Sequence, residues 1–311
     1  MMESKIYDIV IIGSGPAGLT AGIYTTRGSA STLIIGGEIW GGQLMLTTQV
    51  ENFPGFAQGI QGPKLMEEMR AQATRLGAEF KEVNAESIDI TKKPFEITAG
   101  GEKYFAKSVI IATGAETVWL DAPGIKDLIG RGISSCAPCD APFFRGKKVA
   151  VVGGGDAAME EALVLTNYAS EVTIIHRRDA FKASAAMQEK VLSNPKIKVL
   201  WNTEVMEAKG EGKLEKLILK NNQTGETSEV PFDGLFVAIG HKPQSDIFKG
   251  KIDMDERGFI KVSDGSKSSV PGIFVAGDVH DFRYKQAITA ASFGCMAAME
   301  CLDFLAKSGE N

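Results

Sequence analysis

One strand–turn–helix pattern occurs twice in this chain of 311 residues, and it restricts the possible folds more than any other feature. In the first copy, the apolar run 8–12 enters the glycine-rich turn GSGPAG at 13–18, and a helix is expected to follow. In the second copy, the run 148–152 enters GGGDAA at 153–158, again before an expected helix. A buried parallel strand that leads through glycines into a helix is typical of a Rossmann-like βαβ unit. The sequence therefore predicts an α/β protein with two dinucleotide-binding domains.

The order of the remaining strands indicates that the second domain is inserted into the first. Each copy closes with an apolar strand and a glycine turn, at 109–114 and at 235–240. A further strand, 272–278, has no unit of its own to complete, so we expect it to return to the first domain. The predicted first domain consists of residues 1–116 and 246–311, and the predicted second domain of residues 117–245.

The end of the second strand in each copy distinguishes the two nucleotides. In the second copy it carries His176, Arg177 and Arg178, with Lys182 shortly after. Guanidinium groups suit a 2′-phosphate, which favours NADPH in this domain. The alternative is a solvated basic turn without a ligand.

The first copy has an acid where the second has arginine. Gly36, Gly37 and Glu38 occupy this place, and a carboxylate there favours an unphosphorylated ribose, as in FAD or NAD. Asp278, at the end of the returning strand, is suited to accept a hydrogen bond from a flavin side-chain hydroxyl. A strand-end cap is the alternative for Asp278.

A CxxC pair, Cys136 and Cys139, lies just before the second nucleotide-binding strand. A zinc site needs a second pair, and Cys295 and Cys301 are not spaced as one, so we predict no metal. We interpret the pair as redox-active, because one thiol of such a motif can be activated as a thiolate. Asp140 is placed to exchange a proton with a leaving thiolate, although it could also cap a turn.

The apolar run 287–305 is predicted to be a helix. Cys295, Met299 and Leu302 share one face of it, so we interpret Cys295 as a core residue. Cys301 is then expected to have no structural role.

Composition excludes several classes of protein. A net charge of -5 argues against a nucleic-acid binder, and we expect no apolar run of the length needed to cross a bilayer. Four cysteines in 311 residues are too few for a secreted disulfide scaffold, which predicts a cytoplasmic protein.

Ten motifs together resemble the low-molecular-weight thioredoxin reductases over nearly the whole chain. They are GSGPAG (13–18), GGQL (41–44), ENFPG (51–55), ATGA (112–115), CAPCD (136–140), GGGDAAMEEA (153–162), HRRD (176–179), AIGH (238–241), AGDV (276–279) and QAIT (286–289). The resemblance implies a homodimeric flavoprotein enzyme in which NADPH reduces FAD, FAD reduces the cysteine pair, and the dithiol reduces thioredoxin.

The resemblance also assigns roles to residues. Cys139 is expected to face the flavin, Cys136 to attack the thioredoxin disulfide, and Asp140 to be the acid/base. The expected FAD-binding residues are Gly13, Ser14, Gly15, Pro16, Ala17, Gly36, Gly37, Glu38, Gly42, Gln43, Asn52, Val83, Ala112, Gly114, Asp278, Lys285, Gln286 and Ala287. The expected NADPH-binding residues are Gly153, Gly155, Asp156, Ala157, His176, Arg177, Arg178, Lys182, Ile239 and Gly240. The family further implies rotation of the NADPH domain about the two chain crossings.

Three departures from the family pattern affect the expected specificity. Ala141 and Pro142 follow the CxxCD motif where the family usually has glycine, which alters the expected thioredoxin-binding loop. Lys182 and Lys285 replace common arginines, and a lysine lacks the planar fork of a guanidinium.

Two other functions remain open. One is a flavin-dependent reductase for a peroxidase system or a one-electron carrier; the CxxC pair argues against the carrier, and the lack of an N-terminal thioredoxin-like segment against the peroxidase system. The other is a non-catalytic, flavin-binding regulatory protein, which the complete redox motifs disfavour.

Overall fold

The computed structural model describes residues 5–309, which form two compact units. The first unit contains the chain up to Glu116 and from Lys242 onwards, and the second runs from Thr117 to His241. The return to the first unit thus precedes the expected boundary at residue 246. The reason is local: Gln244 donates its backbone N–H to the Gly114 carbonyl at 2.9 Å, and the Thr113 hydroxyl donates to the Gln244 carbonyl at 2.5 Å.

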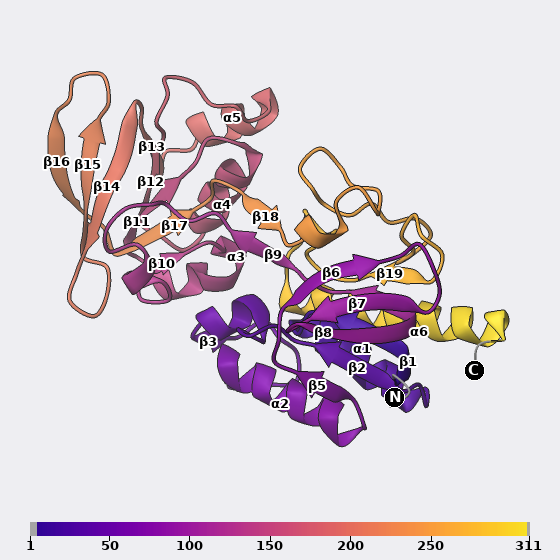
Figure 1. Cartoon of the computed structure of the whole chain (residues 1–311). Helices are drawn as coiled ribbons and strands as arrows, with labels where there is room; N and C mark the ends of the chain where they lie inside the picture. Colours follow the sequence, from indigo (N-terminus) through magenta and orange to yellow (C-terminus); the bar gives the residue numbers. More distant parts are fainter. Residues whose placement is uncertain (1–4, 310–311) are drawn as a thin grey trace. The chain divides into compact units, whose positions relative to one another are not determined.

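The first unit is an α/β domain (Figure 1). Before the crossing its elements are β1 (Ile6–Ile12), α1 (Pro16–Arg27), β2 (Thr32–Ile35), the 3-10 helix η1 (Gly42–Leu46), β3 (Gln49–Val50), β4 (Ile60–Gln61), α2 (Gly62–Arg75), β5 (Glu79–Lys81), β6 (Ala85–Asp89), β7 (Phe95–Ala99), β8 (Glu102–Ile111) and β9 (Ala115–Thr117). After it come β18 (His241–Pro243), η4 (Asp246–Phe248), β19 (Ile273–Val275) and α6 (Ala287–Ser308).

The main sheet of the first unit has the order β5-β2-β1-β8-β7-β6, with β19 also paired to β8. Strands β5, β2, β1, β8 and β19 run parallel, whereas β7 and β6 are antiparallel additions. In the parallel pairing of β19 with β8, Ile273 lies opposite Val109. The last apolar strand therefore pairs within the main sheet of the first unit.

Alternation along β1 separates two hydrophobic layers. Ile9 and Ile11 face the layer formed with α1, α2 and α6, while Val10 and Ile12 face the opposite layer, which includes Phe248. Because both faces are covered, the central strands are apolar at successive positions, as is typical of buried parallel sheets.

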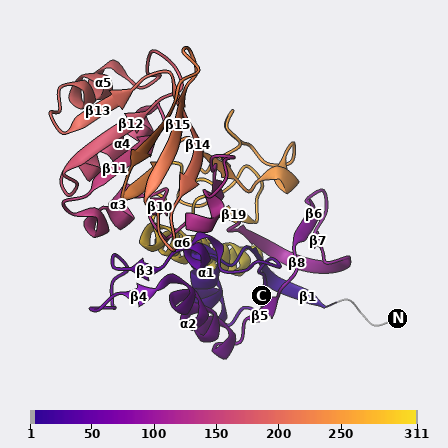
Figure 2. The ribbon, with the colours of Figure 1, turned by 90° about the vertical axis from the view of Figure 1, so that its left-hand side faces the viewer.

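The second unit is a smaller α/β domain (Figure 2). Its elements are η2 (Lys126–Leu128), β10 (Ile133–Ser134), α3 (Ala137–Asp140), η3 (Ala141–Phe144), β11 (Lys148–Val152), α4 (Asp156–Leu165), β12 (Glu171–Ile175), α5 (Ala185–Leu192), β13 (Ile197–Leu200), β14 (Thr203–Lys209), β15 (Lys216–Asn221), β16 (Thr227–Pro231) and β17 (Gly234–Val237).

Both faces of the sheet in the second unit are also covered. The sheet has the all-parallel order β10-β17-β11-β12-β13. Val149 and Val151 face a layer with Met159 of α4, and Ala150 faces a layer with Leu217 of β15. The second layer comes from the antiparallel strands β14-β15-β16, which the glycine motifs did not predict.

Two sequence-based interpretations of helix α6 were wrong. Cys301 is the fully buried cysteine, with its Sγ 3.0 Å from Ser108 Oγ, whereas Cys295 is partly exposed next to Met299. Of the face predicted to be core, Met299 is 59% exposed, whereas Leu302 packs against the core. α6 is also long and apolar enough to cross a bilayer by length and composition, contrary to the sequence-based expectation, but its inner face packs in the core with α1.

Candidate redox and dinucleotide-binding sites

The first glycine turn connects β1 to α1 through a close backbone contact. Gly13 has φ of 115°, and a Cβ atom on Gly18 would lie 2.0 Å from the Gly13 carbonyl oxygen. A Cβ atom on Gly15, the N-cap of α1, would meet nothing within 4 Å. The turn therefore leaves free space at the amino end of α1, where backbone N–H groups favour a phosphate.

Ser14 connects this turn to the loop after β2. Its side chain is buried, donates to the Gly36 carbonyl at 2.6 Å and accepts the Gly41 N–H at 2.9 Å. The loop is also tied to the chain after β5, since Gly37 donates to the Val83 carbonyl at 3.1 Å. Four of the expected FAD-binding residues, Ser14, Gly36, Gly37 and Val83, are thus connected by hydrogen bonds.

Asp278 follows β19 and provides the clearest test of whether a flavin fits. Its Oδ1 atom is buried and has no hydrogen-bond partner among the described residues, like His280 Nε2 nearby in sequence. Burial, reinforced by the charge of Asp281, raises the pKa of Asp278 to about 7, although Lys285 acts in the opposite direction. A hydroxyl group of FAD would supply the donor that this oxygen lacks, so the residues present fit the cofactor.

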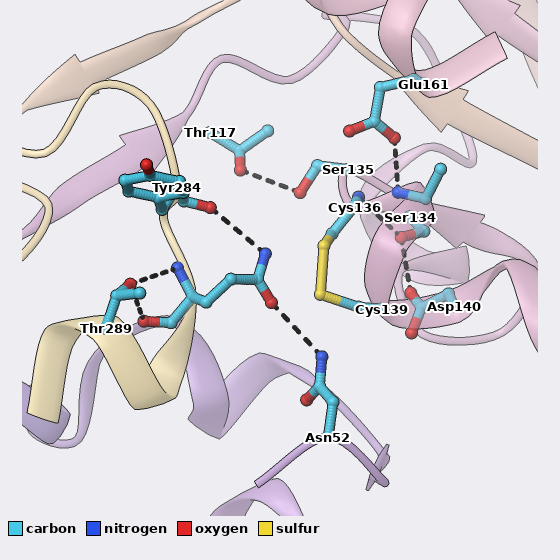
Figure 3. Close-up of a disulfide and its surroundings, with 12 residues drawn as sticks. Asn52, Thr117, Ser134, Ser135, Cys136, Cys139, Asp140, Glu161, Tyr284 and Thr289 are labelled. Carbon is cyan, nitrogen blue, oxygen red and sulfur yellow. Dashed lines mark hydrogen bonds between the residues drawn. A yellow bond between two sulfur atoms is a disulfide. The ribbon is translucent and has the colours of Figure 1, made fainter. Parts of the chain in front are cut away.

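Other expected FAD-binding residues lie at loop ends of the first unit. Asn52 donates to the side chain of Gln286 at 3.3 Å, although the two are far apart in the sequence (Figure 3). Gln286 also caps α6, because its side chain accepts the N–H of Thr289. Gln43 is exposed on η1. Glu38 is exposed after β2 and donates its N–H to Asn84 Oδ1 at 3.2 Å.

The second glycine turn connects β11 to α4 and is similar in outline. Gly153 has φ of 156°, and a Cβ atom there would lie 2.5 Å from the Ala238 carbonyl oxygen. Gly155 again faces free space at the N-cap of the helix. Asp156 in the first turn of α4 accepts the N–H and the hydroxyl of Ser184, both at 2.8 Å, and these bonds lower its pKa.

His176 lies beneath the loop that carries the basic residues. A Cβ atom on Gly154 would lie 2.1 Å from the His176 ring, and His176 Nε2 is 3.0 Å from the Ala180 carbonyl. The ring also packs against Phe181 and Trp201. His176 therefore supports the loop from inside.

The three basic residues expected to bind the 2′-phosphate are exposed. Arg177, Arg178 and Lys182 point from the loop that His176 supports, and Lys182 donates its backbone N–H to the Gly154 carbonyl at 2.7 Å. The loop and the glycine turn are therefore fixed to each other, as a nucleotide site with a phosphate-specific end requires.

Cys136 and Cys139 form a disulfide at α3 of the second unit (Figure 3). The Ser134 hydroxyl lies at its edge: it accepts the Cys136 N–H at 3.0 Å and donates to Asp140 Oδ2 at 2.5 Å. Burial raises the pKa of Asp140, and the hydrogen bond from Ser134 lowers it in part. A carboxyl group with a raised pKa next to a disulfide in sequence is suited to exchange a proton with a departing thiolate.

Sequence reasoning missed two residues of this network. Ser134 precedes the CxxC motif, and Glu161 of α4 accepts the backbone N–H of Ala137. Ser134 could have been found from its closeness in sequence. Glu161 could not, because its contact depends on how α3 packs on α4.

The described residues contain no group of three or more histidine, cysteine, aspartate or glutamate side chains placed to hold a metal ion.

Comparisons with known proteins agree along nearly the whole chain. The family model of pyridine nucleotide-disulphide oxidoreductases matches residues 7–294. The chain is 48% identical over 306 residues to the thioredoxin reductase of Streptomyces coelicolor, a match that covers 97% of this chain and 95% of that protein. The solved thioredoxin reductase of Giardia duodenalis has a TM-score of 0.93 and 42% identity and covers 97% of this chain and 100% of its own. The structure from Streptococcus pyogenes has a TM-score of 0.94 and 36% identity, covering 98% and 100%.

Proposed function

The chain belongs to the pyridine nucleotide-disulphide oxidoreductase family, and from this premise we propose that it is a thioredoxin-disulfide reductase. It is an oxidoreductase that depends on FAD and NADPH. When bound, FAD would supply the two-electron redox chemistry that links NADPH to the Cys136–Cys139 disulfide. The observation that supports the acceptor most directly is the Cys136–Cys139 disulfide, followed in sequence by Asp140, in a chain that is similar to thioredoxin reductases over nearly its full length.

The residues around the disulfide would control its protons. Reduction breaks the Sγ–Sγ bond and takes up two electrons and two protons. Burial raises the pKa of Asp140, so its carboxyl group would be suited to give a proton to a departing thiolate. Cys136 would then attack the disulfide of thioredoxin and leave a mixed disulfide, which Cys139 resolves as the second thiol.

The cofactor-binding residues would hold the two nucleotides in place. The first glycine turn and Asp278 would hold FAD, and the second turn with Arg177 and Arg178 would hold NADPH through its 2′-phosphate. His176 would position these arginines without touching the nucleotide phosphate, since its ring is buried.

A homodimer would cover an apolar surface of the first unit. Ile288, Met296 and Met299 are exposed on the outer face of α6, and Tyr24 of α1 is exposed as well. Exposed apolar side chains grouped on neighbouring helices are typical of a protein interface. Multi-angle light scattering of Met296→Lys with Met299→Glu would show a monomer if this face forms the dimer.

A reducing compartment such as the cytoplasm suits this function. Cys295 and Cys301 are free thiols, and thioredoxin systems keep thiols reduced there.

The decisive experiment is an anaerobic titration of the purified protein with NADPH and then NADH, followed at the flavin band. Oxidised thioredoxin is added last. Bleaching by NADPH and recovery on adding thioredoxin support the proposed function. Bleaching without recovery would point to a different acceptor, with Pro142 the first position to change.

Cys136→Ser separates the two halves of the reaction. We expect complete loss of thioredoxin reduction, because the attacking thiol is gone, with flavin bleaching by NADPH retained. The matched control is Cys295→Ser, which should keep both activities. Loss of bleaching in Cys136→Ser would contradict the assigned order of electron transfer.

A further inference from the structure

Glu161 holds the dithiol loop from a helix outside the CxxC motif. It lies on α4, whose N-cap is Gly155 of the second glycine turn, and its Oε2 accepts the N–H of Ala137 (Figure 3). Ala137 directly follows Cys136, so the Glu161 carboxylate binds the backbone of the residue next to the first cysteine. Glu161 belongs to the GGGDAAMEEA motif (153–162), but the glycine turn itself does not require a carboxylate at this place.

The other backbone donors of the loop are also bonded to oxygen atoms. Cys136 donates to Ser134 Oγ at 3.0 Å. Cys139 and Asp140 donate to the Cys136 carbonyl at 3.2 and 3.1 Å, and Pro138 has no N–H. The loop therefore directs its N–H groups to oxygen instead of offering them to a thiolate.

This arrangement affects the reduced state more than the disulfide. A thiolate is stabilised by nearby N–H groups and positive charge, and it is destabilised by a nearby carboxylate. Dithiols with a stabilised thiolate are weak reductants, because the reduced form is favoured. A carboxylate next to the loop therefore makes the dithiol give up its electrons more readily.

We propose that Glu161 is a positioning residue that fixes the CxxC loop through the Ala137 N–H and, by its negative charge, keeps the dithiol strongly reducing. The proposal deepens the proposed function, because a reductase for thioredoxin needs a dithiol that is not a weaker reductant than its substrate. The redox step is the two-electron, two-proton reduction of one disulfide. Glu161 changes its equilibrium without exchanging electrons or protons itself.

The test is the equilibrium of the Cys136–Cys139 pair in the flavin-bound protein against glutathione buffers. The fraction of disulfide is measured by alkylation and peptide mass spectrometry, which separates this pair from Cys295 and Cys301. Neither NADPH nor thioredoxin takes part, so failure here is distinct from failure of the proposed function. A second readout is the pH midpoint of Cys136 alkylation by iodoacetamide.

Three variants separate charge from hydrogen bonding. Glu161→Gln keeps an acceptor for Ala137 but removes the charge, and Glu161→Ala removes both. Glu160→Gln is the control, because Glu160 is the adjacent, exposed carboxylate on the same helix.

We expect Glu161→Gln to shift the equilibrium about tenfold towards the dithiol, which is about 30 mV for a two-electron couple, and to lower the alkylation midpoint. Glu161→Ala should shift at least as far, and Glu160→Gln should match the wild type. An unchanged equilibrium in Glu161→Gln, or an equal shift in Glu160→Gln, would overturn the proposal.

Discussion

Each of the two glycine turns connects a strand to a helix and packs against the end of the second strand. The side chain that fills the space between turn and strand end comes from the turn in one unit and from the strand end in the other. In the first unit the filling side chain comes from the turn, where buried Ser14 bonds to the carbonyl of Gly36. In the second unit it comes from the strand end, where the His176 ring occupies the space beside Gly154. The first unit thus has Ser14 in the turn and Gly36 at the strand end, and the second unit has Gly154 in the turn and His176 at the strand end. The combined size of the two side chains is therefore constrained, and the size of each one alone is not.

The third position of the motif also differs. A Cβ atom on Gly18 would lie 2.0 Å from a backbone carbonyl oxygen, whereas the second unit has Ala158 buried at the corresponding place. The first turn is therefore packed more tightly between helix and strand than the second. Two copies of one motif can thus have different tolerances to substitution.

The largest effect should come from the third position. Gly18→Val places a side chain against backbone that cannot move away, so we expect a loss of more than about 4 kcal/mol of unfolding free energy and loss of bound flavin. Ala158→Gly in the second copy should cost only about 1 kcal/mol. Urea unfolding and flavin absorbance measure both. Equal losses in the two variants would remove the distinction between the turns.

A smaller effect, and one specific to the first unit, concerns pH. Asp278 has a pKa of about 7 in the folded protein, above that of an unfolded aspartate, so between about pH 4 and 7 the folded state binds more protons. The contribution of Asp278 to the stability of the flavin-free protein should therefore be greatest below pH 4 and fall by up to about 4 kcal/mol as the pH rises to 7. Urea titrations across this range check it, with Asp278→Asn as the variant that should lose this dependence. If the unfolding free energies of the wild type and of Asp278→Asn changed in parallel with pH, the prediction would be contradicted.

The exposed arginines should matter for binding and not for folding. Removing both guanidinium groups, in Arg177→Ala with Arg178→Ala, should raise the KM for NADPH roughly 10- to 100-fold, because charge-assisted bonds to the 2′-phosphate are lost. The KM for NADH should change little, and flavin content should stay the same. Steady-state kinetics with both nucleotides test this prediction. Equal increases in the KM for NADPH and for NADH would contradict a contact between these arginines and the 2′-phosphate.

The smallest effect should come from the filling side chain of the first turn. Ser14→Ala leaves the Gly36 carbonyl and the Gly41 N–H without this partner, at a cost of about 1–2 kcal/mol. Ser170→Ala is the control, because Ser170 makes an exposed bond and should change stability by less than about 0.5 kcal/mol. Thermal unfolding of both variants measures these losses of stability. Equal losses in the two variants would contradict a stabilising role of the buried Ser14 hydroxyl.

The sequence predicted those parts of the fold that have strong local signals. The runs before Gly13 and Gly153 are apolar and glycine-bounded, and both formed the expected parallel strands. The faces of α6 were assigned wrongly because its outer side is also apolar, as exposed Met296 and Met299 show. Periodicity cannot identify the buried face of such a helix.

The site was predicted less completely than the fold. The disulfide partners and Asp140 are adjacent in the sequence, and a motif identifies them. The bond between Glu161 and Ala137 depends on packing of α3 against α4, and the burial of His176 depends on Trp201 and Phe181. Contacts between distant segments leave no local pattern in a single sequence.

The ends of each unit lie close together, which has a consequence for how such a protein can be assembled from parts. In the second unit Val118 donates to the Gly240 carbonyl at 3.0 Å, and in the first unit Gln244 donates to the Gly114 carbonyl. An insert whose entry and exit are adjacent costs its host little loop-closure entropy. The segment from Thr117 to His241 can therefore be treated as a transferable cassette: a short linker between Glu116 and Lys242 should close the host, and the excised piece should fold as its own chain.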